Sequence, residues 1–222
     1  MFDLLEIYTT VTGEKTLYIP EIDETYHSRN GAISESLHVF IHEGLNRIIS
    51  DRISTVNIFE VGFGTGLNAL ITSLESDKQE IKTFFHTVEP YPVGLEYLKQ
   101  LNYGTLLNST DIFQSIHACV WEAEEKITPR FRLKKSMDQL ENITLESNFY
   151  HCIFFDAFAP KKQPELWNAS IFQKLYDALQ IGGVLTTYSA AGQLKRDLKS
   201  VGFKLEHPPG ANGKREMTVA IK

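Results

Sequence analysis

The chain has 222 residues, of which 42% are hydrophobic and 11% aromatic, so it can bury a core and is neither disordered nor fibrous. Its net charge of −6 argues against a protein that coats nucleic acid through bulk charge, and a nucleic-acid partner would have to meet a local basic patch. The two cysteines form no C-x-x-C pair, and no segment has the pattern of a signal peptide or membrane span, so we expect a cytoplasmic protein without membrane contact.

The first 50 residues predict an extension of short strands and one amphipathic helix. Residues 2–24 alternate apolar and polar side chains as far as Pro20, which is typical of one or two short strands. Ser34 and Glu35 resemble an N-cap and a first helical turn. The helix that follows has apolar residues at helical spacing: Leu37, Phe40, Ile41, Leu45, Ile48 and Ile49. We expect it to end at Ser50 and residues 1–50 to pack on a core formed by residues 51–222.

A histidine pair on this helix raises the question of a metal site. His38 and His42 lie four residues apart and therefore on one helical face. The chain has no H-E-x-x-H pattern and no evident third ligand. We expect an ordinary helix face there and no metal.

A glycine-rich turn dominates the sequence. The apolar run from Val56 to Val61 leads into glycines at 62, 64 and 66 and then into an apolar segment of helical length, which predicts strand, turn and helix. Glycines permit positive φ and close approach of a ligand to the helix N-terminus. A dinucleotide fingerprint, G-x-G-x-x-G, would need glycine at 67, whereas this loop reads E-x-G-x-G-x-G, as in S-adenosylmethionine-dependent methyltransferases. The predicted cofactor contacts in this stretch are Glu60, Gly62, Gly64, Gly66 and Asn68. The alternative is a tight turn without a ligand.

Two acids follow the next predicted strands. Thr83 to Val88 is a second buried strand, and Glu89 at its tip is placed to accept both hydroxyls of a ribose. Its alternative role is to cap the following helix, predicted from Pro92 to Leu101. Asp138 follows a third strand, Phe131 to Lys134, and we assign it to the adenine amine, with a helix cap as the alternative.

A second strong signal begins at Tyr150. The continuous apolar run to Phe155 is typical of a central parallel strand, and it ends in Asp156, Phe158 and Pro160. Ligands of open parallel sheets bind at the carboxyl ends of strands, so Asp156 should meet the glycine turn and Glu89. Its alternative role is to cap a turn.

The remaining elements complete an α/β fold. They are predicted as a helix from Pro164 to a stop at Gly182-Gly183, a strand from Val184 to Tyr188, a helix from Gly192 to Val201, and a closing pair, Phe203 to Leu205 with Glu216 to Ile221. Strand and helix alternate, so we predict a Rossmann-like, mostly parallel sheet with an antiparallel C-terminal edge.

At this point the chain resembles, over nearly its whole length, the methyltransferase domain of the bifunctional tRNA 5-methylaminomethyl-2-thiouridine biosynthesis proteins. The matching motifs are Asp23 to Ser28 with Asn30-Gly31, Gly62 to Asn68, Asp156-x-Phe158-Ala159-Pro160 with Pro164 to Trp167, and Gly213-Lys214-Arg215-Glu216-Met217. One departure is Ala157, where the family often has glycine. A second is that nothing here corresponds to the flavin-dependent oxidase half, so we expect a separate enzyme to supply the amine.

The resemblance implies methyl transfer from S-adenosylmethionine to the aminomethyl nitrogen on C5 of the wobble uridine of tRNA. Asp156 would orient the amine and stabilise the ammonium, and it would act as a base only if the site raises its pKa. Asp156 would also contact the cofactor. Phe158 would stack on the flipped uracil and Tyr26 would close over the methionine part of the cofactor, with plain packing as the alternative for both.

The basic patch that an acidic chain needs for tRNA would come from Lys161, Lys162, Lys214 and Arg215, with Lys214 and Arg215 as the stronger pair. For Lys161 and Lys162 a solvated loop is the better interpretation. Two other functions stay open: an N-methyltransferase for a small amine or another nucleoside, and a non-catalytic nucleotide-binding partner subunit. The sequence does not define the oligomeric state, and we favour a monomer.

Overall fold

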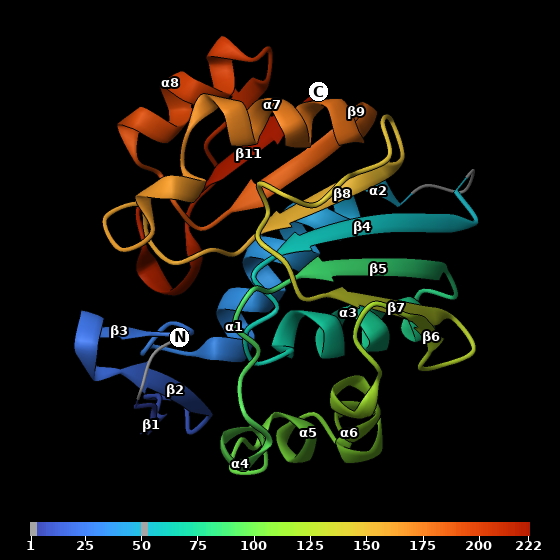
Figure 1. Cartoon of the computed structure of the whole chain (residues 1–222), viewed down its shortest axis with the longest axis vertical. Coiled ribbons are helices and arrows are strands. Elements are labelled where there is room, and N and C mark those ends of the chain that lie inside the picture. Colours follow the sequence, from blue (N-terminus) through green and yellow to red (C-terminus); the bar gives the residue numbers. More distant parts are fainter. Residues whose placement is uncertain (1–3, 50–52) are drawn as a thin grey trace.

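A central sheet organises the chain in a computed structural model that describes residues 4–49 and 53–222 (Figure 1). In the described residues this sheet has eight strands in the order β10-β11-β9-β8-β4-β5-β7-β6. The parallel strands are β4 (Thr55–Val61), β5 (Lys82–Val88), β7 (Phe131–Ser136), β8 (Tyr150–Phe155) and β9 (Leu179–Thr187). Each pairs in parallel with its neighbour, which confirms the predicted Rossmann-like architecture.

The two edges of this sheet are antiparallel. The predicted C-terminal pair is confirmed as β10 (Lys204–Glu206) and β11 (Thr218–Ile221), with β11 antiparallel to β9. The opposite edge carries β6 (Glu124–Lys126), antiparallel to β7, which the sequence analysis missed. A separate sheet near the N-terminus contains β1 (Glu6–Thr9), β2 (Lys15–Ile19) and the short β3 (Glu24–Thr25).

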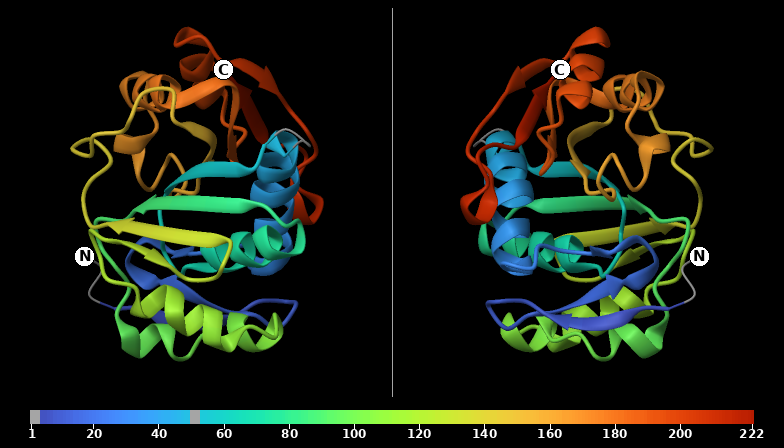
Figure 2. Two further views of the ribbon diagram at one scale, coloured as in Figure 1. Left: turned by 90° about the vertical axis from the view of Figure 1, so that its right-hand side faces the viewer. Right: turned by 90° about the vertical axis from the view of Figure 1, so that its left-hand side faces the viewer.

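Helices cover both faces of the central sheet, and Figure 2 shows the first long helical segment and α7 on opposite sides of the strands. One face holds α1 (Ala32–Ser36), η2 (Leu37–Leu45), α2 (Asn46–Ile48), α3 (Leu67–Lys78) and α6 (Thr110–Ala118). The other holds α7 (Ala169–Ala178) and α8 (Gly192–Ser200). The remaining helices are η1 (Pro20–Ile22), α4 (Leu95–Leu98), α5 (Tyr103–Leu106), η3 (Pro164–Leu166) and η4 (Ala211–Gly213). None of the described helices is long and apolar enough to cross a membrane.

The first helical segment differs from its prediction. It begins at Ala32 after Gly31, so Ser34 lies inside α1 rather than at its cap. The middle stretch, η2, is a π-helix, and at Gly44 a Cβ would lie 3.1 Å from the Phe154 ring, so the segment sits close against β8. Leu37 is 39% exposed, unlike the buried core members of the stripe. The predicted end at Ser50 and the boundary between residues 50 and 51 lie outside the described residues.

Two other predicted helices were too long. The stretch from Pro92 is helical only over α4, which follows Gly94. The helix predicted from Pro164 begins at Ala169, because the Asn168 side chain accepts from the backbone N–H groups of Ser170 and Ile171. Gly182 and Gly183 do not end it, since they lie inside β9.

Candidate functional site

A cavity of about 740 Å³ opens at the carboxyl ends of β4, β5 and β8. Three backbone hydrogen bonds join the segments that leave the strands: Asp156 N–H to the Val61 carbonyl at 3.0 Å, Gly62 N–H to Val88 at 3.0 Å, and Glu89 N–H to Ser136 at 3.0 Å. The glycine turn, Glu89 and Asp156 therefore meet at one cavity, as predicted from the ends of parallel strands.

The glycine turn is adapted to close contact. Gly62 has φ of +90°, and a Cβ there would lie 2.8 Å from the Asp156 carbonyl oxygen, so a side chain would push the two loops apart. Gly64 has φ of +50° and a Cβ there would approach the Tyr26 ring to 3.1 Å. Gly66 is the N-cap of α3 with φ of +72° and offers no capping side chain. Leu67 and Asn68, the first two residues of α3, line the cavity, so the start of this helix lies at the site.

Glu89 is tied to this turn. One carboxylate oxygen accepts from Gly64 N–H at 3.1 Å and the other from Tyr91 N–H at 2.9 Å. Burial nevertheless raises the pKa of Glu89, because these two hydrogen bonds offset the loss of water only partly. The residue lines the cavity at the tip of β5, in the position expected for a ribose acceptor.

Asp156 lines the same cavity and is half-buried. The Asn68 amide donates to its Oδ2 at 2.8 Å, and the Ser36 hydroxyl in turn donates to Asn68 Oδ1. Burial, helped by the negative charge of Glu35, raises the pKa of Asp156 to about 7, although the Asn68 hydrogen bond and Lys214 act in the opposite direction. The condition under which this residue could act as a base is therefore met.

Glu60 lies in the core and is not among the residues that line the cavity. Its side chain is 1% exposed, and neither carboxylate oxygen makes a hydrogen bond within the described part of the chain. Burial raises its pKa well above the usual range, more than the nearby Thr87 and Asn68 side chains lower it. Any influence on a ligand would pass through neighbours such as Asn68.

The two predicted aromatic residues both line the cavity and contact each other. The rings of Tyr26 and Phe158 meet edge to face with centroids 5.2 Å apart. The backbone of Phe158 is held on both sides: Trp167 Nε1–H donates to its carbonyl at 2.8 Å, and its N–H donates to Gln163 Oε1 at 3.2 Å. The spacing between the aspartate motif and the tryptophan motif therefore fixes the loop that carries Phe158.

Besides Glu60, three predicted site residues lie outside the cavity lining. Asp138 is exposed, and its Oδ1 accepts from Gln139 N–H and the Asn142 side chain, so it stabilises a turn; the cavity is lined instead by the next residues, from Gln139. Gly66 faces Phe63 and His117 rather than the cavity. Arg215 is exposed beyond its edge.

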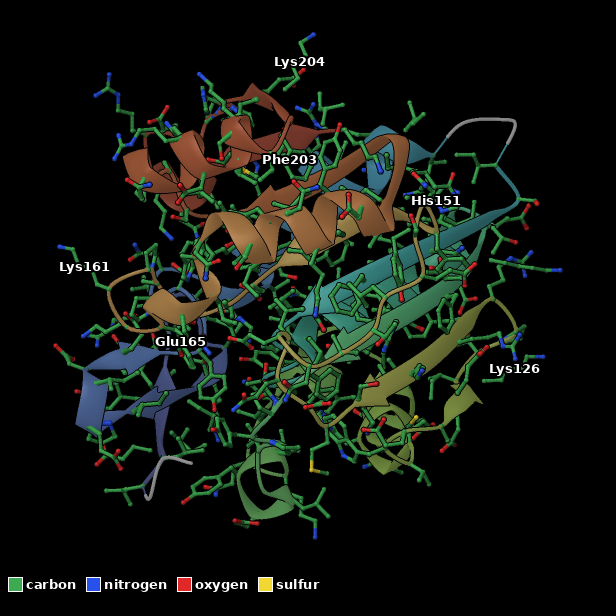
Figure 3. The ribbon with its side chains drawn as sticks, turned by 45° about the horizontal axis from the view of Figure 1, so that its top comes forward. Lys126, His151, Lys161, Glu165, Phe203 and Lys204 are labelled. Carbon is green, nitrogen blue, oxygen red and sulfur yellow. The ribbon has the colours of Figure 1, made fainter. Side chains whose placement is uncertain are left out.

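The basic residues divide into two groups. Lys214 lines the cavity and pairs with Glu35, Nζ to Oε1 at 2.6 Å. Lys162 also lines it and donates to the Ile22 carbonyl, which connects the loop after β8 to the N-terminal extension. Lys161, by contrast, projects away from this loop into solvent (Figure 3).

Two of the cavity residues that were not predicted from the sequence are Glu35 and Tyr188. Glu35 was assigned only to the first turn of a helix, and Tyr188 only to the end of a strand. The Tyr188 hydroxyl donates to the Ala157 carbonyl at 2.8 Å and so supports the loop after β8. The pairing of Glu35 with Lys214 could not be predicted, because the two residues are 179 positions apart in the chain.

The chain is similar to known proteins over most of its length. Residues 110–222 match a family model described as S-adenosyl-L-methionine-dependent methyltransferase. The chain is 32% identical to the tRNA 5-methylaminomethyl-2-thiouridine biosynthesis bifunctional protein MnmC of Cupriavidus metallidurans, over 95% of this chain and 33% of that protein. It is 31% identical to the protein of that name from Burkholderia pseudomallei strain K96243, over 92% and 34%.

The chain thus spans about a third of the length of these curated relatives. Among solved structures, the crystal structure of MNMC2 from Aquifex aeolicus is similar with a TM-score of 0.75 and 25% identity. That similarity covers 98% of this chain and 70% of the other.

Proposed function

Because its C-terminal half matches that family model, the chain belongs to the S-adenosylmethionine-dependent methyltransferases, and we propose that it methylates the aminomethyl nitrogen on C5 of a wobble uridine in tRNA. The named activity of relatives that are 30 to 32% identical supports this substrate. The observation that carries the proposal is the meeting of the glycine turn, Glu89 and Asp156 at one cavity. A donor and an amine bound there would be held in line for transfer.

The residues present fit the donor. Gly62 and Gly64 leave room where a Cβ would collide with Asp156 or Tyr26, and the start of α3 supplies backbone N–H groups for a carboxylate. Glu89 would accept hydrogen bonds from the ribose hydroxyls. Asn68, which is hydrogen-bonded to Asp156, would hold the cavity wall in place beside the donor. S-adenosylmethionine supplies a methyl group on a positively charged sulfur, which is electrophilic without further activation by the protein.

Asp156 would remove the proton from the substrate amine. A primary alkyl amine has a pKa of about 10, so most of it is protonated near neutral pH and cannot act as a nucleophile. A carboxylate whose pKa is about 7 is a much better proton acceptor than an ordinary aspartate. This role goes beyond the orienting role expected from the sequence, because the sequence could not specify the burial that raises the pKa.

The residues that cover the cavity, Tyr26, Phe158 and the Glu35–Lys214 pair, form the side from which RNA would approach. Phe158 would stack on the flipped uracil and Tyr26 would close over the donor, both within an aromatic pair already in contact. Exposed Arg215 would bind phosphate, whereas Lys214 is engaged by Glu35. Residues 1–50 would serve as an extension that closes the site, and a separate cytoplasmic enzyme would supply the amine.

The proposal is tested with tRNA that carries 5-aminomethyluridine, incubated with the chain and isotope-labelled donor. Mass analysis of the digested nucleosides should find the label in 5-methylaminomethyluridine alone. Equal methylation of the free nucleoside would favour a small-amine methyltransferase. Donor binding without any methyl transfer would favour a non-catalytic partner subunit.

A further inference from the structure

An ion pair stands in the cavity that Asp156 also lines. Glu35 comes from α1 and Lys214 from the loop before β11, and the two side chains meet with Nζ and Oε1 2.6 Å apart. Both residues line the cavity together with Asp156. The Glu35 side chain is 12% exposed and that of Lys214 is 43% exposed, so the anion is the more deeply placed partner.

Each partner is anchored to a different part of the site. The second oxygen of Glu35 accepts from Ser28 N–H at 3.0 Å, which ties it to the segment that carries Tyr26. The Lys214 ammonium lies 5.4 Å from the centroid of the Tyr188 ring, and the Tyr188 hydroxyl bonds to the Ala157 carbonyl next to Asp156. The pair therefore connects the N-terminal extension, the C-terminal loop and the loop after β8.

The charged and titratable groups around Asp156 come from every neighbouring element. Asn68 of α3 donates a hydrogen bond, Glu60 of β4 lies in the core beneath, and Tyr188 follows β9. Glu35 and Lys214 belong to the same set, and Glu89 and Lys162 also line the cavity. Glu35 raises the pKa of Asp156 and Lys214 lowers it, so the two members of the ion pair act in opposite directions.

We propose that Glu35 and Lys214 are positioning residues that together set whether Asp156 is ionised and able to receive the proton of the substrate amine. This role in catalysis rests on the proposed function, whereas the ionisation of Asp156 can be measured without it. Loss of Lys214 leaves a second carboxylate unpaired beside Asp156, which favours the protonated acid. Loss of Glu35 leaves an unpaired ammonium, which favours the carboxylate.

The test is a carboxyl NMR titration of the whole chain labelled with ¹³C-aspartate, without substrate, over roughly pH 5 to 9. Asp156→Asn identifies the resonance. We expect Lys214→Met to move the Asp156 midpoint to higher pH and Glu35→Gln to move it to lower pH, each by roughly half a unit or more. Lys214→Arg should restore the wild-type midpoint because it retains the charge.

Lys195→Met is the matched control, since Lys195 pairs with Glu216 at 2.8 Å in a similar ion pair that does not act on Asp156. In Lys195→Met the titration midpoint of Asp156 should equal that of the wild type. Shifts of both test variants in the same direction, or no shift in either, would overturn the inference. If Glu35→Gln does not fold, Lys214→Met and Lys214→Arg still decide the sign. Absence of methyl transfer to tRNA would refute the proposed function and leave this titration unaffected.

Discussion

The carboxylates of the N-terminal extension and those at the strand ends differ in how the fold treats them. Glu14, in the turn between β1 and β2, is 5% exposed, and burial alone would raise its pKa. Hydrogen bonds from Thr10, Thr12 and the backbone outweigh that effect and leave the pKa below its ordinary value. At the strand ends, Glu89 and Asp156 have too few donors to offset burial, and their pKa values are raised.

The direction of the pKa shift distinguishes a structural carboxylate, Glu14, from carboxylates that could bind a ligand. Glu14 closes a turn and has its partners within the fold, so ionisation stabilises it. The acids at the strand ends are poorly satisfied by the protein alone, which is the usual condition of groups that bind or react. Three predictions concern the acids at the strand ends, two of them with Glu14 as the comparison, and a fourth concerns the exposed surface.

The largest effect is expected at the reacting carboxylate. Asp156→Asn should reduce the rate of methyl transfer by about 10²- to 10⁴-fold, because the amide cannot take the proton. Binding of S-adenosylmethionine, measured by calorimetry, should stay within a few-fold of wild type. In the wild type the rate should fall as pH decreases below about 7, where Asp156 becomes protonated. A variant with near-normal turnover would remove Asp156 from the mechanism.

A smaller loss is expected for the ribose acceptor. Glu89→Gln should weaken donor binding by about 10-fold to 100-fold, since it replaces two charged acceptor sites with one neutral acceptor. The calorimetric Kd is the measurement. Glu14→Gln is the control, and it should leave this Kd unchanged because Glu14 does not line the cavity. Equal effects of the two variants would contradict the distinction between the two regions.

Stability should change in opposite directions in the two regions. Because the pKa of Asp156 is raised on folding, ionised Asp156 destabilises the folded protein increasingly as pH rises from about 4 through about 7. Asp156→Asn should therefore increase the free energy of unfolding at pH 8 by about 1 kcal/mol. Because the pKa of Glu14 is lowered on folding, ionised Glu14 stabilises the folded protein at pH values above its ordinary pKa. Glu14→Gln should therefore lower the free energy of unfolding by about 1–2 kcal/mol at those pH values. Urea unfolding of both variants measures these changes. Destabilisation by both would mean that Asp156 is simply structural.

The smallest effect is expected on the exposed surface. Arg215→Ala should weaken tRNA binding a few-fold and reduce the salt slope by roughly 0.7 to 0.9, as for one lost phosphate contact. Filter binding at several salt concentrations measures both quantities, and Lys199→Ala on α8 is the control for a surface charge elsewhere. An unchanged slope would place the RNA on another face.

The strand ends were predictable from sequence because local patterns specify them. The apolar runs that lead into Gly62, Glu89 and Asp156 each mark a strand that is followed by a glycine or an acid, and parallel strands bring such ends together. Asp138 was misplaced by the same reasoning, because its side chain closes a turn with Gln139 and Asn142 instead of facing the cavity.

The cover was less predictable because it depends on distant segments. The Glu35–Lys214 pair joins residues from the two ends of the chain, and no periodicity connects them. The antiparallel β6 also depends on a neighbour in space, because it pairs with β7, and no sequence pattern marks η2 as π-helical. The raised pKa of Asp156 belongs to this class, since it follows from burial.

The structure of the complex with S-adenosylhomocysteine is the most direct test of the central claim. We predict the ribose hydroxyls within hydrogen-bond distance of Glu89, the amino-acid part against Gly62 and Gly64, and the sulfur directed toward Asp156. A nucleoside bound instead in the neighbouring groove lined by Trp121 and Lys135, with Glu89 and Asp156 uncontacted, would contradict it.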